Sequence, residues 1–463
     1  MVTVLGANTL SSGGFEVANS CRFDGSSSSM SITPGSNMNL DRWTWSGWIK
    51  RSSIGVLQSI LAADNAASDT TLIEFDANDK LNFLNLVSNN IKGKKITDRV
   101  FRDISAWYHI VVVWDSANST AADRIKIYVN GVRETSFATS DNPDSGVDSS
   151  LGESGVATLI GTYVGEDSRF FNGYLAEVVL IDGSALAPTS FGEFDEDSGI
   201  WKPIKVSGLT FGTHGFYLDF QASGNLGNDA NGGTDLGESG LAAVDQSTDT
   251  CTNNFCTMNP VLGALYTPTF SEGNLQVTQS TDNQHAVTHG TFAVTKGVWY
   301  WEVKYIGNTG TSGPSDRAVG IQVPNVTNVF TQANYNTAGS ILYYGYDGGE
   351  IFDEGTSTTA DYGTYSQNSI LGISLDMDNS VISFYINGNE VVDNYALGSN
   401  ASVIATPAVT WPNGTASGTE MGMNFGSPFY ALSSAVADAN GHGAFEYTPV
   451  GFALCTKNLA EFG

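Results

Sequence analysis

Two short phrases, KIYVNG at 126–131 and SFYINGN at 383–389, constrain the fold more than any other feature of the sequence. Each phrase is a run of alternating β-forming residues that ends in an Asn-Gly pair. A two-residue hairpin turn of type I′ needs positive φ at both central positions, and Asn-Gly meets that need at the lowest steric cost. Each phrase therefore predicts a strand, a tight turn and a returning strand. We interpret Asn130-Gly131 and Asn387-Gly388 as turns that fix strand register.

The surroundings of the two phrases are also alike. In each case an apolar strand ends in acidic residues, a turn follows, and the next strand leads into the Asn-Gly pair. Outside this three-strand pattern the halves do not align, because the first lacks a YWEV-like opening and the second lacks a WYHI run. The repeat therefore indicates two domains of related architecture, and it argues against a recent duplication.

Composition agrees with an all-β fold built from two antiparallel β-sandwiches. The chain has 463 residues, which is too long for one ordinary core. Only 15% of the residues are charged, while glycine numbers 52 and aromatic residues reach 11%. Such a mixture favours short strands joined by tight turns. No long stretch has the 3.6-residue periodicity of an amphipathic helix.

Strand density along the chain predicts four segments: an N-terminal arm (1–20), a first sandwich (21–205), an extended linker (206–265) and a second sandwich (266–463). The linker assignment rests on SGNLGNDANGGTDLGESG at 223–240, which has almost nothing to bury. GFYLDF at 215–220 is the one strand expected within it. PTSFGEFDED at 188–197 is the one segment expected to form a helical turn.

The formal net charge of −28 excludes some partners. A strongly acidic surface repels the phosphate backbone of nucleic acids and anionic membranes. The first 20 residues have neither the basic start nor the apolar run of a signal peptide or membrane helix, so we expect no membrane insertion. The four cysteines are too sparse for a disulfide scaffold and are expected to be free thiols.

The first half resembles LamG-like domains, which are jelly rolls of the concanavalin A type. The matching phrases are TWSGWIKR (44–51), WYHIVVV (107–113), KIYVNGV (126–132), LIGTY (159–163) and FNGYLAEVVLIDGSALAPTSF (171–191). The second half resembles the SPRY sandwich, through GVWYWEV (297–303), VGI (319–321), LGISLD (371–376), ISFYING (382–388), TPAV (406–409) and NFG (424–426). These resemblances imply two concanavalin A-like sandwiches.

The order of these domains, with FGEFDEDSGIWKP between them and FEYTP and ALCTKNL near the end, resembles virion structural proteins of marine tailed phages. That resemblance implies a tail-fibre or adhesin component that is assembled in the host cytoplasm. Its expected partners are other virion proteins and a host-surface glycan or protein. It also implies a homo-oligomer, with a trimer as the expected symmetry. A capsid decoration or head-fibre protein with a structural role is the alternative.

A glycan hydrolase is a second alternative, because hydrolases share the concanavalin A-type architecture. Retaining hydrolases of this shape carry paired carboxylates on one strand in an E-x-D-x-x-E pattern. IEFDAND places Glu74, Asp76 and Asp79 near that pattern, but Asp79 is expected in a turn. GEFDEDSG places Glu193 and Asp195 on a segment not expected to be a strand, with serine where the third acid should stand. We therefore expect no enzymatic activity.

Candidate binding and metal residues lie on polar loops, where function commonly sits on a rigid sandwich. In the second half, the aromatic loop residues that a core needs least are Tyr335, Phe352 and Tyr362. Asp316 and Arg317 are the charged binding candidates there. No cofactor is required. LamG-type domains often hold Ca²⁺ at a loop rim, and for such a site the candidate ligands are Asp64, Asp115, Asp123, Asp141 and Asp144. His109 lies in an apolar run and is expected in the core.

Overall fold

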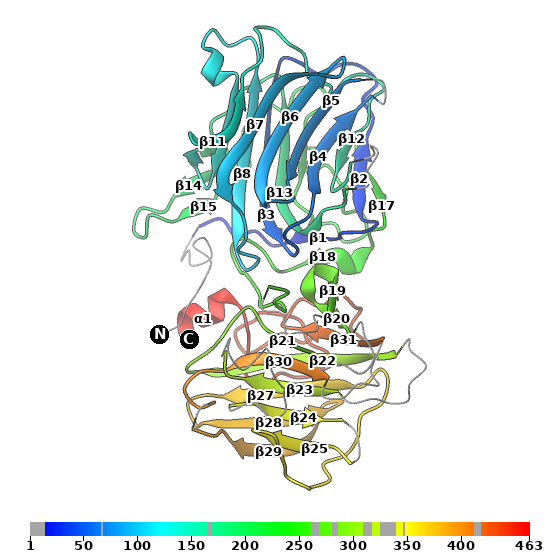
Figure 1. Ribbon diagram of the computed structural model, residues 1–463, viewed down its shortest axis with the longest axis vertical. Helices are drawn as coiled ribbons and strands as arrows, with labels where there is room; N and C mark the ends of the chain where they lie inside the picture. Colours follow the sequence, from blue (N-terminus) through cyan, green and yellow to red (C-terminus); the bar gives the residue numbers. More distant parts are fainter. Residues whose placement is uncertain are drawn as a thin grey trace. The chain divides into compact units, whose positions relative to one another are not determined.

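In the computed structural model, the chain is all-β and divides into two compact units, the first ending at Thr252 and the second running from Asn253 to Gly463 (Figure 1). The structure describes residues 14–65, 68–163, 169–261, 268–279, 286–308, 317–324, 339–345, 348–399, 401–411 and 418–463. Within these ranges, no helix is long and apolar enough to cross a membrane.

Two antiparallel eight-stranded sheets enclose the core of the first unit. The first, sheet A, has the order β10 (Val132–Arg133), β9 (Ile125–Val129), β8 (Trp107–Asp115), β3 (Arg42–Arg51), β13 (Asn172–Asp182), β1 (Ser20–Asp24) and β18 (Gln246–Ser247), with β16 (Phe216–Leu218) also paired to β13. The second, sheet B, has the order β11 (Phe137–Asp141), β7 (Asn90–Val100), β6 (Lys80–Val87), β5 (Thr70–Phe75), β4 (Gln58–Asp64), β12 (Thr158–Ile160), β2 (Ser29–Ile32) and β17 (Gly237–Ser239).

Both faces of sheet A are buried, as the apolar run of β8 predicts. Residues of one parity on β3, among them Trp43 and Trp45, pack into the core between the sheets. Trp48, on the other parity, packs on the outer face against Trp201, whose indole donates to Nδ1 of His109 at 3.0 Å. His109 is 1% exposed, so its predicted place in the core is confirmed.

The segment 206–265, predicted to be a linker, instead belongs to the two units. Its part before Thr252 supplies β16, β17 and β18 to the first unit, and the second unit already begins at Asn253. Two buried ion pairs fasten this segment to the first unit: Lys50 to Asp249 at 2.6 Å and Arg22 to Asp245 at 2.9 Å. The expected strand in 215–220 is present as β16.

The glycine-rich stretch 223–240 folds because carboxylates replace an apolar core. Asp229 is 4% exposed, and its two oxygens accept hydrogen bonds from the backbone N–H groups of Tyr217, Asn231 and Gly233. Asp235 accepts a further one from the N–H of Asp229. The stretch lacks apolar residues, which predicts a linker, but it forms an ordered loop held by charge-assisted hydrogen bonds.

The ends of the predicted first sandwich also differ from expectation. Strand β1 begins at Ser20, inside the predicted arm, and Val17 is buried against the outer face of sheet A. The expected helical turn is a 3₁₀ turn, η2 (Pro188–Ser190), followed by a hairpin of β14 (Gly192–Phe194) and β15 (Trp201–Pro203). The other short 3₁₀ turns are η1 (Ala121–Asp123), η3 (Ala243–Asp245) and η4 (Glu272–Asn274).

The second unit is also a two-sheet sandwich. Its larger sheet has the order β19 (Thr269–Ser271), β20 (Gln276–Thr278), β31 (Thr419–Asn424), β22 (Val298–Asn308), β27 (Ile370–Asp376), β28 (Val381–Ile386) and β29 (Asn389–Ala396), with β32 (Phe452–Ala453) parallel to β22. Its smaller sheet has the order β21 (Ala286–His289), β30 (Thr406–Trp411), β23 (Ala318–Gln322), β24 (Ile341–Tyr344), β25 (Glu350–Asp353) and β26 (Thr356–Ser357). The helix α1 (Thr456–Phe462) follows β32.

A buried carboxylate on β22 anchors the C-terminal segment of the second unit. Glu302 is fully buried and accepts hydrogen bonds from the backbone N–H groups of Glu446 and Tyr447 and from the amide of Asn424. Burial raises the pKa of Glu302, and these hydrogen bonds offset part of that rise. The acidic residue of the YWEV phrase therefore fastens the chain end to the sheet.

The two Asn-Gly turns have the predicted conformation. Asn130 and Gly131 have φ of 49° and 77°, and Asn387 and Gly388 have φ of 48° and 77°. In both turns the asparagine also bonds to a neighbouring strand through two groups. Asn130 donates its N–H to the carbonyl of His109 and accepts the N–H of His109 on Oδ1, and Asn387 does the same with Ile370. Each asparagine thus ties its turn to a third strand.

Candidate functional site

Glu74 lies on the face of sheet B that points away from the core. Its neighbours on β5, Ile73 and Phe75, point into the core, so alternation places Glu74 on the outer face. Its side chain is nevertheless buried, because Arg169 covers it. Arg169 Nη1 lies 2.7 Å from Oε2 of Glu74, and Asn82 Nδ2 on the adjacent β6 donates to Oε1 at 2.8 Å. Both carboxylate oxygens therefore have a partner.

The network extends from Glu74 to Asp64, the last residue of β4. The guanidinium of Arg169 lies over the ring of Tyr163, 5.1 Å from its centroid. The hydroxyl of Tyr163 donates to Oδ2 of Asp64 at 2.7 Å. We call Asp64, Glu74, Asn82, Tyr163 and Arg169 the Glu74 cluster. Asp64, Tyr163 and Arg169 are partly exposed, so the cluster offers solvent a carboxylate, an aromatic ring and a cation.

Two further polar atoms lie beside Glu74. Ser59 stands opposite Glu74 on β4, and Asn82 stands opposite it on β6. The hydroxyl of Ser59 and Oδ1 of Asn82 are buried and have no hydrogen-bond partner among the described residues. Such atoms normally find a partner in protein or water, so this row leaves two buried polar atoms beside Glu74 that a water molecule could satisfy.

The carboxylates near the hydrolase pattern have different surroundings. Asp76 follows the end of β5 and accepts the backbone N–H groups of Asn78 and Lys80, so it closes the turn. Asp79 has φ of 64° and lies in the same turn, as predicted. In the second near-match, Glu193 lies on β14, a short strand that sequence reasoning missed. Lys202 lies 3.5 Å from Glu193 and 2.9 Å from Asp195.

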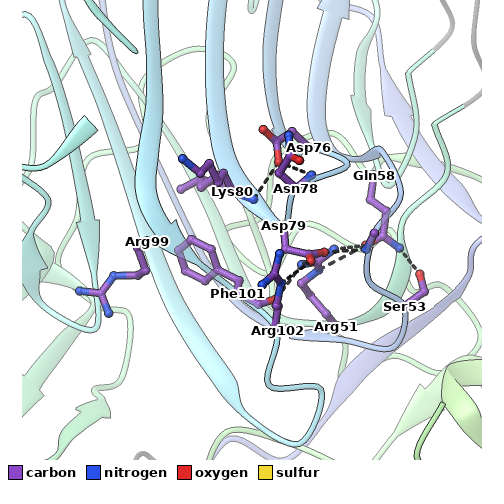
Figure 2. A network of polar contacts seen from close by, with 12 residues as sticks. Arg51, Ser53, Gln58, Asp76, Asn78, Asp79, Lys80, Arg99, Phe101 and Arg102 are labelled. Atoms are coloured by element: carbon purple, nitrogen blue, oxygen red, sulfur yellow. Dashed lines mark hydrogen bonds and ion pairs between the residues drawn. The ribbon is translucent and has the colours of Figure 1, made fainter. Parts of the chain in front are cut away.

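Asp79 is the centre of a second polar network at the end of the same hairpin (Figure 2). Its Oδ1 lies 3.1 Å from Nη1 of Arg51 and accepts the N–H of Gly55 at 2.7 Å, and its Oδ2 lies 2.9 Å from Nε of Arg102. Arg51 also donates to the carbonyl of Phe101 at 2.6 Å. Burial alone would raise the pKa of Asp79, but the hydrogen bonds from Gly55, Arg102 and Arg51 outweigh it and hold the pKa below its ordinary value.

The predicted Ca²⁺ ligands do not come together. Arg42 and Asn118 contact Asp115, and Arg133 lies 2.7 Å from Asp123. Asp64 belongs to the Glu74 cluster, while Asp141 and Asp144 are exposed. In the part of the chain that the structure describes, no three His, Cys, Asp or Glu side chains form a group that could hold a metal ion. The five residues therefore do not fit one shared Ca²⁺ site there.

The predicted binding residues of the second unit fall into three groups. Asp316 and Tyr335 lie outside the described residues. Phe352 and Tyr362 are partly exposed, and the ring of Phe352 stands edge-on to Tyr344 with centroids 5.3 Å apart. Near them, the hydroxyl of Tyr395 donates to Asp353 at 3.1 Å. A ligand on this surface would meet aromatic rings and one carboxylate.

The structure contradicts the prediction that Arg317 is a binding residue on a loop, because Arg317 lies in the core of the second unit. It is 1% exposed, and its guanidinium lies 3.7 Å from the ring centroid of Tyr305 and 4.4 Å from that of Tyr365. It also donates to the carbonyl of Tyr365 at 2.7 Å. Two aromatic rings can hold a desolvated guanidinium, which the sequence position beside a polar loop does not reveal.

Sequence reasoning missed Arg169, Asn82 and Arg102. Arg169 meets Glu74 from 95 residues away, and Arg102 meets Asp79 from 23 residues away. The signal that could have found Asn82 is its position in the hairpin of β5 and β6, which predicts a cross-strand neighbour for Glu74. No comparable local signal exists for the two arginines.

Comparison with known proteins identifies two domains. The Concanavalin A-like lectin/glucanases superfamily matches residues 24–189, and the SPRY domain matches residues 298–426. The chain therefore contains a LamG-like, concanavalin A-type domain followed by a SPRY domain, in two β-sandwiches. No curated protein matches the chain.

Three similar solved structures each cover 36–38% of the chain. The SPRY domain of human HERC1 is 19% identical, with 36% of this chain and 96% of that chain covered and a TM-score of 0.29. A native heptameric SAP-like pentraxin from Limulus polyphemus is 17% identical, with 38% and 80% covered and a TM-score of 0.29. The TRIM65 PSpry domain is 16% identical, with 37% and 92% covered and a TM-score of 0.27. Similarities at this level do not assign a ligand.

Proposed function

We propose that this chain is a non-enzymatic recognition protein, a tail-fibre or adhesin component of a tailed-phage virion that binds a glycan or protein on the host surface. The observation that carries the proposal is the presence in one chain of a lectin-like and a SPRY sandwich. The net charge of −28 agrees with an exposed, soluble assembly and disfavours nucleic acid as a partner.

The state of Glu74 supports recognition over hydrolysis. A general acid or nucleophile needs a carboxyl group that can reach the glycosidic bond, with a second carboxyl about 5–9 Å away. Both oxygens of Glu74 are engaged by Asn82 and Arg169, and the next carboxyl along the chain, Asp76, closes a turn. These contacts suit a carboxylate that positions neighbouring groups.

The Glu74 cluster suits a hydroxyl-rich ligand. A partly exposed tyrosine ring can stack on the apolar face of a sugar, while carboxylate and guanidinium groups bind its hydroxyls. The surface around Phe352 and Tyr395 in the second unit offers aromatic rings and one carboxylate, Asp353. We therefore place host contact on one of these two surfaces. The chain is expected to form a homo-oligomer and to attach to other virion proteins in an orientation that leaves the binding surface exposed.

Adsorption tests the proposal. Purified protein is expected to bind host cells and to block adsorption of virions that carry it, and gold-labelled antibody is expected to mark the tails. Labelling of heads, with no binding to host cells, would instead favour the decoration alternative. Release of sugar fragments from host polysaccharide, abolished by Glu74→Gln, would favour the hydrolase.

Two matched variants assign the binding surface. Tyr163 and Tyr395 are both partly exposed, and each donates its hydroxyl to an aspartate of its own unit. Tyr163→Ala is expected to weaken host binding by about two- to tenfold if the Glu74 cluster is the site, since stacking is worth about 0.5–1.5 kcal/mol. Tyr395→Ala is the control, and the reverse outcome assigns the second unit. Unchanged binding in both variants contradicts the proposed surfaces.

A further inference from the structure

Lys50 is a lysine held in the interior of the first unit. Its side chain is 1% exposed, and that of Asp249 is 2% exposed. Nζ of Lys50 lies 2.6 Å from Oδ2 of Asp249, although the two residues are 199 positions apart in the chain. An amine and a carboxyl group are therefore in direct contact where bulk water does not reach.

Aromatic side chains of sheet A surround this pair. Trp107, Lys50 and Tyr174 stand opposite one another on the neighbouring strands β8, β3 and β13. Trp107 and Tyr174 belong to the apolar cluster on the outer face of the sheet. Nζ of Lys50 lies 5.5 Å from the ring centroid of Tyr174, and Nε1 of Trp107 donates to Oδ1 of Asp249 at 3.1 Å. Each carboxylate oxygen of Asp249 thus accepts a hydrogen bond, one from Trp107 and one from Lys50.

Backbone contacts hold Asp249 in place against sheet A. Asp249 follows β18, in which Ser247 pairs with Ser20 of β1. The hydroxyl of Ser20 donates to the carbonyl of Asp249 at 2.6 Å, and the N–H of Asp249 donates to the hydroxyl of Ser247 at 3.1 Å. Both members of the lysine–aspartate pair are therefore fixed by ordered strands. Such an arrangement raises the effective concentration of an intramolecular reaction to about 10⁵–10⁸ M.

We propose that Lys50 and Asp249 condense into an amide, so that the mature protein carries an intramolecular isopeptide cross-link. A buried ion pair is costly, and transfer of one proton from Nζ to Oδ2 along their hydrogen bond makes both groups neutral. The neutral amine attacks Cγ of Asp249 and forms a C–N bond. The bond from Cγ to Oδ2 breaks, a second proton of Nζ goes to that oxygen, and one water molecule leaves. The N–H of Trp107 lies at Oδ1, where negative charge develops during the attack.

A second lysine–aspartate pair shows what burial changes. Nζ of Lys202 lies 2.9 Å from Oδ2 of Asp195, and the two side chains are 12% and 14% exposed. Hydrogen bonds from Lys202 and Ser198 hold the pKa of Asp195 below its ordinary value, so this carboxyl group stays ionised. An ionised carboxylate resists attack by an amine, so we expect no amide at this pair.

The cross-link would enclose most of the first unit. The loop that it closes runs from residue 50 to residue 249 and includes β16, β17 and β18, and the second unit begins at Asn253. Tension applied through the second unit would therefore reach β3 through Asp249 without pulling these three strands from their sheets. A link that closes a long loop also restricts the unfolded chain. The cross-link does not depend on what the protein binds, so failure of host binding would leave it unaffected.

Mass spectrometry of the denatured full chain tests the cross-link. The mature wild-type protein is expected to be lighter than its sequence predicts by the mass of one water molecule. Proteolytic digestion is expected to yield a branched peptide that joins Lys50 to Asp249. Lys50→Arg keeps a cation beside Asp249 but removes the nucleophilic amine. This variant is therefore expected to have its full sequence mass and no branched peptide.

The rate of cross-linking tests the role of Trp107. Trp107→Phe keeps an aromatic ring but removes the N–H that Oδ1 of Asp249 accepts. In samples taken at successive times after synthesis, this variant is expected to lose water at least about tenfold more slowly than the wild type. Circular dichroism checks that both proteins are folded. Equal rates would overturn the role assigned to Trp107.

The wild-type protein contains its own control. Lys202 and Asp195 are expected only in unbranched peptides, because their pair is open to solvent. A mature wild-type protein of full sequence mass overturns the proposal. So does a loss of water that persists in Lys50→Arg or maps to residues other than Lys50 and Asp249. The wild-type mass and peptide map decide the outcome even if a variant folds poorly.

Discussion

At the scale of single residues, buried carboxylates organise this protein. Asp79, Asp229 and Glu302 each accept hydrogen bonds from several backbone or side-chain donors while nearly or fully buried. A buried charge is costly unless it is paired and hydrogen-bonded, so each of these residues fixes the segments that supply its donors. The loops of this chain contain few apolar residues, so these hydrogen bonds hold the loops in place where apolar side-chain packing would otherwise do so.

The first prediction concerns Asp79. Asp79→Ala is expected to lower the free energy of unfolding of the first unit by about 3–5 kcal/mol, because it leaves the buried Arg51 guanidinium without its carboxylate. Asp76→Ala, in the same turn, removes only hydrogen bonds to local N–H groups and is expected to cost about 1 kcal/mol. Urea denaturation of both variants measures the difference. If both substitutions lowered the free energy of unfolding equally, the proposed role of Asp79 in neutralising buried Arg51 would be wrong.

A second residue, Glu177, makes stability depend on pH. It has φ of 49° at an irregularity of β13, and it accepts the Tyr217 hydroxyl at 2.6 Å. Burial raises the pKa of Glu177 to about 7, and the Tyr217 hydrogen bond offsets part of that rise. The folded protein therefore holds this proton more tightly than the unfolded chain does.

The sign of the pH effect follows from that difference. The stability that protonated Glu177 supplies is fully present below its ordinary pKa of 4.5 and is lost as pH rises through about 7. The loss amounts to about 3 kcal/mol. Glu177→Gln keeps an acceptor for Tyr217 without the charge, so it is expected to be more stable than wild type at pH 8 and equal at pH 4. Urea denaturation at both pH values checks this, and no gain at pH 8 would count against it.

At the scale of elements, the two Asn-Gly turns show one local solution used in both units. Each turn has positive φ at both positions and an asparagine that bonds to a third strand. Each glycine also lies against an aromatic ring: a Cβ on Gly131 would come within 2.3 Å of Trp201, and one on Gly388 within 2.6 Å of Tyr447. The turns therefore join a hairpin, a neighbouring strand and a covering segment.

Two substitutions at Asn387 separate these contributions. Asn387→Gly keeps easy access to positive φ but removes the side-chain oxygen that accepts the N–H of Ile370. We therefore expect the free energy of unfolding to fall by about 1 kcal/mol. Asn387→Ala also imposes the left-handed backbone cost, which adds about 1–2 kcal/mol. Equilibrium unfolding of the second unit measures both, and the same pair at Asn130 should behave alike in the first unit. If alanine and glycine proved equivalent, the φ argument would fail.

At the scale of the whole molecule, the boundary between units falls at 252/253 and not at either end of the predicted linker. The segment before that boundary completes the first unit with three strands and two buried ion pairs. The first unit should therefore need residues well beyond the end of its family match at residue 189.

Fragments test this boundary. A fragment that ends at residue 252 is expected to unfold cooperatively, with the stability of the first unit in the full chain. A fragment that ends at residue 205 leaves Lys50, which is 1% exposed, without Asp249 and is expected to lose at least about 3–5 kcal/mol. Circular dichroism during thermal unfolding compares them. Equal melting temperatures of the two fragments would indicate that 206–252 is a linker and not part of the first unit.

The sequence by itself determined the parts of this protein that local chemistry controls. Alternation and apolar runs predict strands such as β8, and Asn-Gly predicts the hairpin turns, because each depends on residues adjacent in the chain. The blocks that carry the LamG-like and SPRY resemblances predict the two sandwiches for the same reason.

Tertiary structure alone decided which charges meet. Glu74 finds Arg169, Lys50 finds Asp249, and Arg317 enters a cage of tyrosines, although each reads from the sequence as an ordinary polar residue. The stretch 223–240 folds through carboxylates that accept nearby backbone N–H groups, although its composition predicts a linker. Electrostatic partners depend on distance in space, and strand order, not sequence spacing, sets that distance.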